Sequence, residues 1–195
     1  MKYKLTDETM TTESGVLLHR IECVECFADV KAGDIGGWIE REENLSQYGN
    51  AWVYGNARVC DNAQVYGNAL VCDNAQVCDN AEVYGDADVY GDARVCGYAR
   101  VCDNARVYGN AQVYGNAVID NINDYIVFKN NWSSGRYFTW TRSNDMWKVG
   151  CFYGTGKELI EKAYKDSKLS GDCYKAYVEL VDKLKDVFEK QQQKQ

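Results

Sequence analysis

Apolar and polar positions between Tyr48 and Ile119 recur with a period of six residues and without interruption. Each unit reads Tyr or Cys, Gly or Asp, Asn or Asp, Ala, a variable residue and Val, with Tyr98 as a departure at the third position and Ile119 in the last unit. Unbroken repetition at a six-residue period is typical of a β-helix. Twelve consecutive units predict a short left-handed β-helix of about four triangular coils, because three hexapeptides complete one coil.

The positions within the unit have distinct expected roles. Val and Ala alternate towards the core, and the Gly or Asp of the second position tolerates the positive φ of a tight corner. The Tyr or Cys position points outward and forms columns of every third unit, with Tyr66 above Tyr84 in one column and Tyr90 above Tyr108 in another. These aromatic columns either stiffen the coil by stacking or form apolar stripes that bind a partner.

The segment 1–47 lacks the repeat and is predicted to be an N-terminal cap. It contains two β-like runs, Gly15–Ile21 and Phe27–Val30, followed by a Gly-rich turn at Gly33–Gly37. Solenoid ends expose unpaired strand edges, so a cap is physically required for a soluble chain. The expected domains are therefore the cap at 1–47, the β-helix at 48–120 and a third unit at 121–195.

The third unit is predicted to be an α+β domain. Its pattern predicts a three-stranded antiparallel sheet at Tyr125–Asn130, Arg136–Ser143 and Met146–Tyr153, and helices at Lys157–Ser167 and Asp172–Lys190. A break between the helices is expected at Ser170–Asp172, and a frayed tail at Gln191–Gln195. The whole chain is thus expected to be mainly β, a capped β-helix followed by this domain.

Charge and cysteine content narrow the classes of function. The net charge is −7, and no segment carries the dense basic patch of a nucleic-acid-binding protein, so direct nucleic-acid binding is not expected. No run is long and apolar enough to span a membrane. Nine Cys, mostly inside the repeat, do not form the framework expected of a disulfide scaffold, and with no export signal they predict a reducing, cytoplasmic location.

No catalytic residue, cofactor or metal site is expected from the motifs. Cys23 and Cys26 have CxxC spacing without a second ligand pair, and the outward column Cys60, Cys78 and Cys96 offers no fourth ligand for zinc. His19 is the single histidine and lies outside the repeat, in a strand-like run where a structural role is expected.

The richest candidate for binding is a cluster of aromatic and basic residues in the third unit. Trp, Tyr and Arg dominate the hot spots of protein interfaces. The candidates are Trp132, Arg136, Trp140, Arg142, Trp147 and Lys148, together with the column tyrosines Tyr66, Tyr84, Tyr90 and Tyr108. The competing interpretation is core packing, with Phe138, Trp140 and Arg142 on one sheet face and Tyr137, Thr139 and Thr141 on the other.

Two stretches resemble known families. The hexapeptides, with Val53, Asn56, Ala57 and their equivalents, resemble left-handed β-helix proteins, a superfamily best known for acyltransferases. The segments Asp29–Glu40 and Asn44–Gln47 resemble the start of bacterial and phage hexapeptide-repeat proteins of the YdcK-like group, which are labelled transferases. The resemblance implies a bacterial or phage hexapeptide-repeat protein.

Three functions remain open from the sequence. The first is a non-catalytic scaffold that binds a protein, as a phage or prophage accessory factor that binds or inhibits a host protein. The host protein could be one that binds nucleic acid, and its basic surface would then meet the acidic repeat. The second is a degenerate acyltransferase that uses acyl-CoA, although the coil has neither an inserted loop nor a histidine. The third is self-assembly into a homo-oligomer through the β-helix faces or the C-terminal domain.

Overall fold

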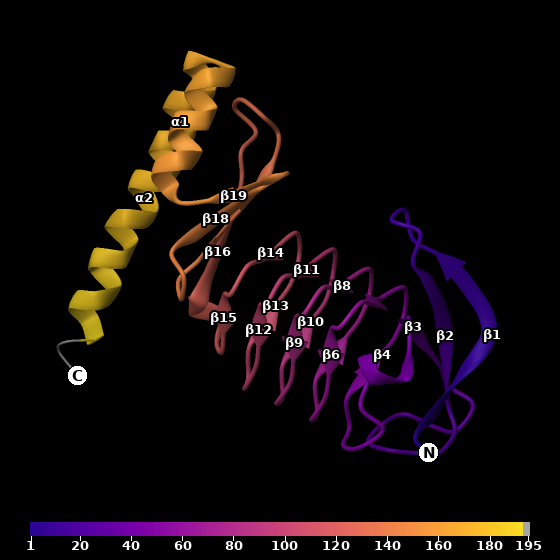
Figure 1. The fold of residues 1–195 in the computed structure, drawn as a ribbon. Coiled ribbons are helices and arrows are strands. Elements are labelled where there is room, and N and C mark those ends of the chain that lie inside the picture. The colour runs from indigo at the N-terminus through magenta and orange to yellow at the C-terminus, as the bar shows by residue number, and fades with distance from the viewer. Residues whose placement is uncertain (193–195) are drawn as a thin grey trace.

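The computed structural model describes residues 1–192, and its centre is a three-faced β-solenoid (Figure 1). Each hexapeptide supplies one two-residue strand that ends at the inward Val or Ile, and strands of successive coils pair in parallel. The strands are β4 (Trp52–Val53), β5 (Arg58–Val59), β6 (Gln64–Val65), β7 (Leu70–Val71), β8 (Gln76–Val77), β9 (Glu82–Val83), β10 (Asp88–Val89), β11 (Arg94–Val95), β12 (Arg100–Val101), β13 (Arg106–Val107), β14 (Gln112–Val113) and β15 (Val118–Ile119). The predicted mainly-β solenoid is confirmed, and it fits a left-handed β-helix.

The core of the solenoid consists of stacked Ala and Val columns. Every Ala of the repeat, from Ala51 to Ala117, is fully buried, as are the Val residues that precede each corner. The corners have positive φ at the second position whether it is Gly or Asp, for example 66° at Gly55 and 58° at Asp61. The inward and corner roles expected from the repeat are therefore confirmed.

The solenoid has about five turns, and the prediction of four is corrected. The additional coil comes from residues outside the repeat. Strand β3 (Ile35–Ile39) pairs in parallel with β5, and Leu45 forms a parallel bridge with Val65. Ile39 and Leu45 are fully buried there, because each takes the inward position that a repeat Val fills in the later coils.

An antiparallel hairpin precedes this first coil. It consists of β1 (Tyr3–Thr11), which the sequence did not predict, and β2 (Leu17–Cys23), which overlaps the predicted run Gly15–Ile21. The run Phe27–Val30 forms an isolated bridge rather than a strand. Strand β2 pairs with β3, so the hairpin continues the sheet that contains β5, β8, β11 and β14.

The Gly-rich turn expected at Gly33–Gly37 is largely a strand. Gly36 and Gly37 lie buried inside β3. A Cβ atom at Gly36 would lie 2.5 Å from Ile21 Cγ1 and 2.7 Å from the carbonyl oxygen of Val53. These glycines are therefore required by close packing and not by a turn.

The C-terminal unit is a four-stranded antiparallel sheet with two helices, and the prediction of three strands is corrected. Its elements are β16 (Tyr125–Lys129), β17 (Tyr137–Thr141), β18 (Met146–Val149), β19 (Phe152–Gly154), α1 (Gly156–Asp166) and α2 (Lys168–Gln192). Two short 3-10 helices occur earlier in the chain, η1 (Glu42–Asn44) and η2 (Ile122–Asp124). Val149 pairs with Phe152, so the predicted third strand folds into a hairpin at Gly150, whose φ is 55°.

The two helices are separated at Ser167, and not at the break expected at Ser170–Asp172. Ser167 has extended backbone angles, whereas Gly171 lies within α2. A Cβ atom at Gly171 would lie 2.1 Å from the Tyr164 ring, so this glycine serves helix contact. The tail expected at Gln191–Gln195 begins inside α2, and residues 193–195 lie outside the described residues.

The sheet of the C-terminal unit lies between the helices and the end of the solenoid. Phe138, Trp140, Trp147 and Val149 are buried against the helices. On the other face, Thr139 Oγ1 accepts a hydrogen bond from the backbone N–H of Gln112 at 2.9 Å. Tyr125 covers the last coil and donates to the carbonyl oxygen of Arg106 at 2.9 Å. The expected alternation of the two faces of β17 is confirmed at Phe138, Trp140 and Thr139.

The molecule has the outline of a saddle (Figure 1). The hairpin β1–β2 and the sheet β16–β19 stand at opposite ends of the solenoid and rise on the same side of it. Between them lies the sheet formed by β5, β8, β11 and β14, here called the upper face. Within residues 1–192, no helix is long and apolar enough to cross a membrane.

Candidate binding surface

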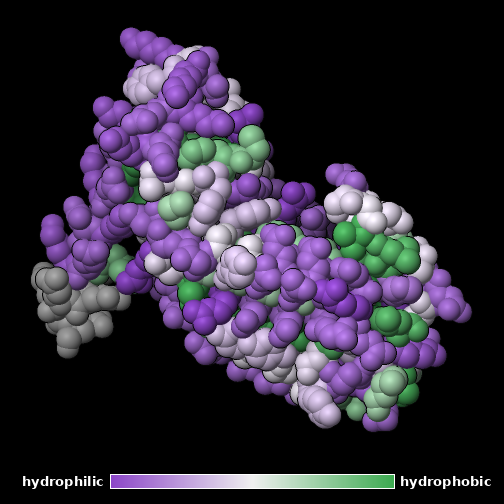
Figure 2. All heavy atoms as spheres, in the orientation of Figure 1, coloured by the Kyte–Doolittle hydropathy of each residue, from purple (hydrophilic) through white to green (hydrophobic). Residues whose placement is uncertain are grey.

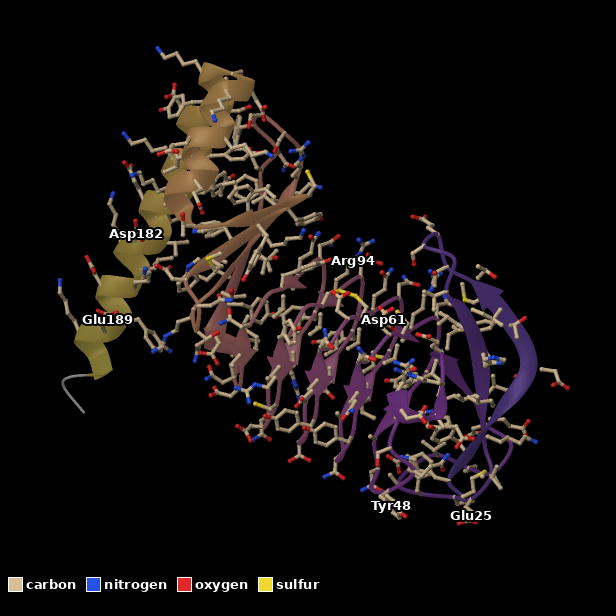
Figure 3. The ribbon with its side chains drawn as sticks, viewed as in Figure 1. Glu25, Tyr48, Asp61, Arg94, Asp182 and Glu189 are labelled. Carbon is tan, nitrogen blue, oxygen red and sulfur yellow. A yellow bond between two sulfur atoms is a disulfide. The ribbon has the colours of Figure 1, made fainter. Side chains whose placement is uncertain are left out.

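A groove of about 630 Å³ lies on the upper face of the solenoid. Its floor includes the outward side chains of Arg58, Gln76 and Arg94, which follow one another because their strands pair in register. Its wall is the tip of the hairpin, residues 12–16. The space-filling view shows the hollow between the two ends of the molecule, where hydrophilic side chains predominate (Figure 2). Figure 3 labels Arg94 and Asp61 at the upper side of the coil.

Acidic and basic side chains occupy different parts of this groove. Asp61 and Asp79 stand at the corner of the coil, and each accepts a backbone N–H from the next coil, at 3.1 and 2.9 Å respectively. Glu13 is at the hairpin tip. Arg58 and Arg94 point outward from the strands, and neither forms a salt bridge with any carboxylate in the described part of the chain.

Two cations meet where the upper face reaches the C-terminal sheet. Lys148 Nζ lies 4.3 Å from the centroid of the Tyr114 ring. Burial lowers the pKa of Lys148, and the positive charge of nearby Arg94 lowers it further. Burial raises the pKa of Tyr114, and Arg94 opposes that rise. Lys148 therefore lies over Tyr114, and both groups feel the positive charge of Arg94.

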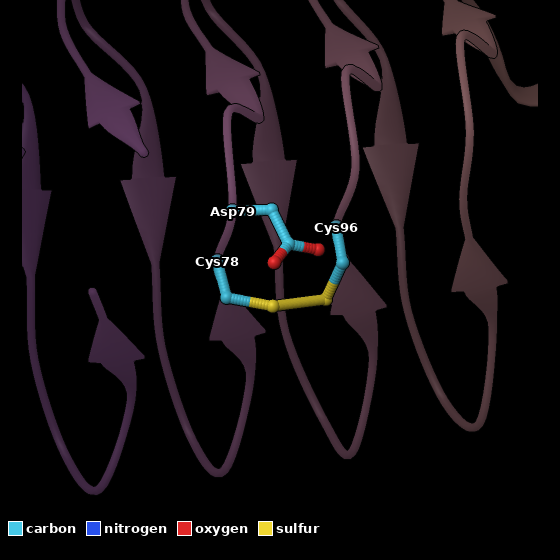
Figure 4. A group of neighbouring side chains, drawn as sticks. All are labelled: Cys78, Asp79 and Cys96. Atoms are coloured by element: carbon cyan, nitrogen blue, oxygen red, sulfur yellow. A yellow bond between two sulfur atoms is a disulfide. The ribbon is translucent and has the colours of Figure 1, made fainter. Parts of the chain in front are cut away.

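The outward Cys column contains a disulfide, which corrects the expectation of unpaired thiols. Cys78 and Cys96 are joined across adjacent coils, with their Cα atoms 4.8 Å apart (Figure 4). Residues of one column stand one strand spacing apart, and this distance lies within the range that a disulfide spans. Burial raises the pKa of Cys60, the neighbouring thiol of the same column, to about 12.

The disulfide also determines whether the sulfurs of this column can act as metal ligands. The ligand atoms of Cys78, Asp79 and Cys96 lie within 4.8 Å of one another. A metal needs thiolates, whereas these two sulfurs are bonded to each other. The two sulfurs therefore form a covalent cross-link between adjacent coils.

The tyrosine columns stack as predicted. The ring centroids of Tyr66 and Tyr84 are 4.9 Å apart, with 2° between the ring planes, and those of Tyr90 and Tyr108 are 5.3 Å apart, with 11° between the planes. Tyr66 also donates a hydrogen bond to Glu82 at 3.1 Å. These contacts stiffen the coil, and the binding of a partner by these four rings stays a prediction.

The aromatic and basic candidates of the C-terminal unit do not form one surface. Trp140 and Trp147 are buried in the core between sheet and helices, and Trp140 lines a cavity of about 450 Å³ together with Arg142 and Phe188. Trp132 is 81% exposed in the loop between β16 and β17. Arg142 lies 3.6 Å from Asp124 and stacks on Phe188, while Arg136 lies beside the Gly150 turn. Lys148 faces the solenoid, where its Nζ lies over the Tyr114 ring.

The single histidine does not line the groove. His19 lies half-buried in β2, with Nδ1 3.4 Å from the carbonyl oxygen of Thr6. The free thiol of Cys23 is buried, and burial raises its pKa, whereas Cys26 is exposed.

Sequence reasoning missed the floor of the groove. The signal was the variable fifth position of the hexapeptide, read in every third unit: Arg58, Gln76, Arg94 and Gln112 form one outward row. The wall could not be predicted, because it depends on where the hairpin and the sheet rise from the solenoid.

The repeat, its three parallel sheets and its corners define a β-solenoid protein of the hexapeptide-repeat class. The YdcK Beta solenoid repeat matches residues 63–79 and 99–115, two stretches that lie within the coil. The chain is also 42% identical over 59 residues to a protein of Escherichia coli (strain K12) named "Uncharacterized acetyltransferase YdcK". That match covers 27% of this chain and 18% of the relative, so the chain spans less than a fifth of that protein's length.

Proposed function

We propose that this protein is a non-catalytic scaffold that binds a protein partner in the groove of the upper face. The groove itself carries the proposal: the solenoid forms its floor, and the tip of the hairpin forms its wall. The coil has no inserted loop to build an acyl-donor site, and no histidine lines the groove. Rigid floors with flanking walls suit binding, because little conformational entropy is lost on association.

Affinity capture from a bacterial lysate tests this proposal with a matched pair of variants. Gln76→Tyr fills the floor of the groove, whereas Gln64→Tyr places the same side chain at the same position of an identical Asn-Ala-Gln-Val unit on another face. We expect Gln76→Tyr to lose proteins that the wild type and Gln64→Tyr retain. Equal capture by both variants would exclude the groove as the binding surface.

The partner has a proposed source and a proposed charge. The resemblance to bacterial and phage proteins favours a phage or prophage accessory factor that inhibits a host protein. The acidic corners of the coil, such as Asp86, Asp92 and Asp103, would meet a basic surface of that host protein. Capture through these corners should weaken as salt rises, and a salt-insensitive complex would rule out this charge pairing.

The second candidate is a degenerate acyltransferase, and the name of the Escherichia coli relative favours it. It predicts that acetyl-CoA raises the midpoint of thermal unfolding, because a ligand that binds only the folded state stabilises it. An unchanged midpoint at saturating acetyl-CoA, alongside groove-dependent capture, would leave the scaffold as the function.

End-to-end self-assembly is the weakest of the three functions. The backbone edge of the last coil is engaged by Thr139 and Ser143, which accept hydrogen bonds from Gln112 and Val118. Sedimentation at rising concentration tests it, and a constant sedimentation coefficient argues against assembly.

A further inference from the structure

Four cations lie on the two surfaces that border the hollow, the upper face of the solenoid and the C-terminal sheet. Arg58 and Arg94 belong to the floor, and Lys129 and Lys148 belong to the sheet. Lys129 pairs with Tyr137 across β16 and β17, and Lys148 pairs with Thr139 across β17 and β18. Tyr137 and Thr139 are two residues apart and point to one face of the sheet, and Thr139 contacts the solenoid. All four cations are therefore on surfaces that face the hollow, and this set is called the basic corner.

The cations of the basic corner are not paired with a carboxylate, although Glu13, Asp61 and Asp79 line the same groove. None of its four cations forms a salt bridge within residues 1–192. Two of them lie over aromatic rings instead: Lys129 Nζ is 4.0 Å from the Tyr137 centroid, and Lys148 Nζ is 4.3 Å from that of Tyr114. Cations held on rings and without carboxylates are available to an anionic ligand.

From this geometry we infer that the basic corner binds an acidic peptide segment of a protein partner, an inference that rests on the proposed binding function. Arg58 and Arg94 are separated by one strand, β8, hence by about 10 Å, and roughly three residues of extended peptide span that distance. A short segment lying along the floor thus brings carboxylates to both arginines and then to Lys148.

The carboxylates of the groove favour the binding of a short acidic segment over that of a long polyanion, because they repel a continuous negative charge. Glu13 at the hairpin tip and Asp61 and Asp79 at the corner of the coil line the same groove as Arg58 and Arg94. A nucleic acid carries a charge at about every 1.7 Å of duplex axis and would have to pass these carboxylates. An acidic peptide places its few charges at the corner and leaves uncharged residues beside the carboxylates.

The test is fluorescence anisotropy of a short labelled peptide of alternating Glu and Ser, with alternating Gln and Ser as the control peptide. We expect the Glu peptide alone to bind, with an affinity that falls as sodium chloride rises. The variant Arg94→Gln with Lys148→Gln should weaken binding roughly tenfold or more, because two charged contacts are lost. Arg100→Gln is the matched control, since Arg100 precedes an inward Val in the same way but lies on the face of β12.

Three outcomes would overturn the inference: equal affinity for both peptides, an unchanged affinity of the double variant, or tighter binding of a short oligothymidine than of the Glu peptide. Circular dichroism melting confirms that the variants fold. If capture depends on Gln76 while no Glu peptide binds, the scaffold function stands and the acidic partner fails. If the Glu peptide binds and nothing is captured through the groove, the anion-binding site stands and the scaffold function fails.

Discussion

One outward position of the hexapeptide determines what joins neighbouring coils at the corner. At Tyr66 and Tyr84, which follow each other in one column, the rings stack. At Cys78 and Cys96, which follow each other in another column, a disulfide forms, while the preceding Cys60 is a free thiol. Both outcomes have the same cause, since the solenoid holds column members one strand spacing apart.

The first prediction concerns this disulfide, which closes a stretch with a sequence separation of 18. Its removal by Cys78→Ser with Cys96→Ser should lower the free energy of unfolding by about 3 kcal/mol, because a cross-link of this size restricts the unfolded chain. Urea unfolding measures it. Cys72→Ser, a free thiol at the same repeat position, is the control. A wild type that is equally stable with and without dithiothreitol would contradict the expectation.

Residue roles inside the repeat were predictable from the sequence, because each position is repeated in an equivalent environment. The inward Ala and Val and the positive-φ corners follow from the pattern alone. The disulfide does not follow from the cysteine count, because an odd number of cysteines spread through a repeat does not indicate pairing. It follows from the distance between two members of one column, which a disulfide can span. Burial of Trp140 and Trp147 was anticipated only as the competing interpretation of that cluster.

At the scale of elements, glycine was the main source of error. Gly36 was assigned to a turn and lies in β3, while Gly150 was placed inside a strand and forms a turn. A glycine serves either a positive φ or a close approach of two segments. Sequence alone does not distinguish these, because the approaching segment is distant along the chain.

Gly36 provides the second prediction. Gly36→Ala should destabilise the fold by roughly 1–3 kcal/mol, since the added methyl group overlaps Ile21 and the backbone of Val53. Thermal or urea unfolding measures the loss. Lys31→Ala, an exposed position in the same connection, should stay within about 0.5 kcal/mol of the wild type. If Gly36→Ala were neutral, close packing would not explain the glycine.

At the scale of the whole molecule, the groove depends on how three parts are joined. The hairpin extends a solenoid sheet through β3, so its direction follows from strand pairing. The C-terminal sheet instead meets the last coil through side chains, among them Thr139, Ser143 and Tyr153. No periodic pattern predicts such contacts, and for this reason the floor of the candidate site was recoverable from the sequence while its walls were not.

The third prediction tests that side-chain junction. Thr139→Val removes the oxygen that accepts the Gln112 N–H, and a backbone donor left without its partner at a buried junction costs about 1–3 kcal/mol. Thr139 and Thr141 are both buried in β17, but Thr141 Oγ1 bonds to Asn144 within its own unit, so Thr141→Val is the matched control. We expect hydrogen exchange at the Gln112 amide to accelerate in Thr139→Val and to stay unchanged in Thr141→Val. If the Thr139→Val junction is loosened, the basic corner loses its fixed geometry, and the affinity for the Glu peptide should fall even though all four cations remain. Exchange at Gln112 that is equally slow in both variants would show that the sheet is held on the solenoid by other contacts.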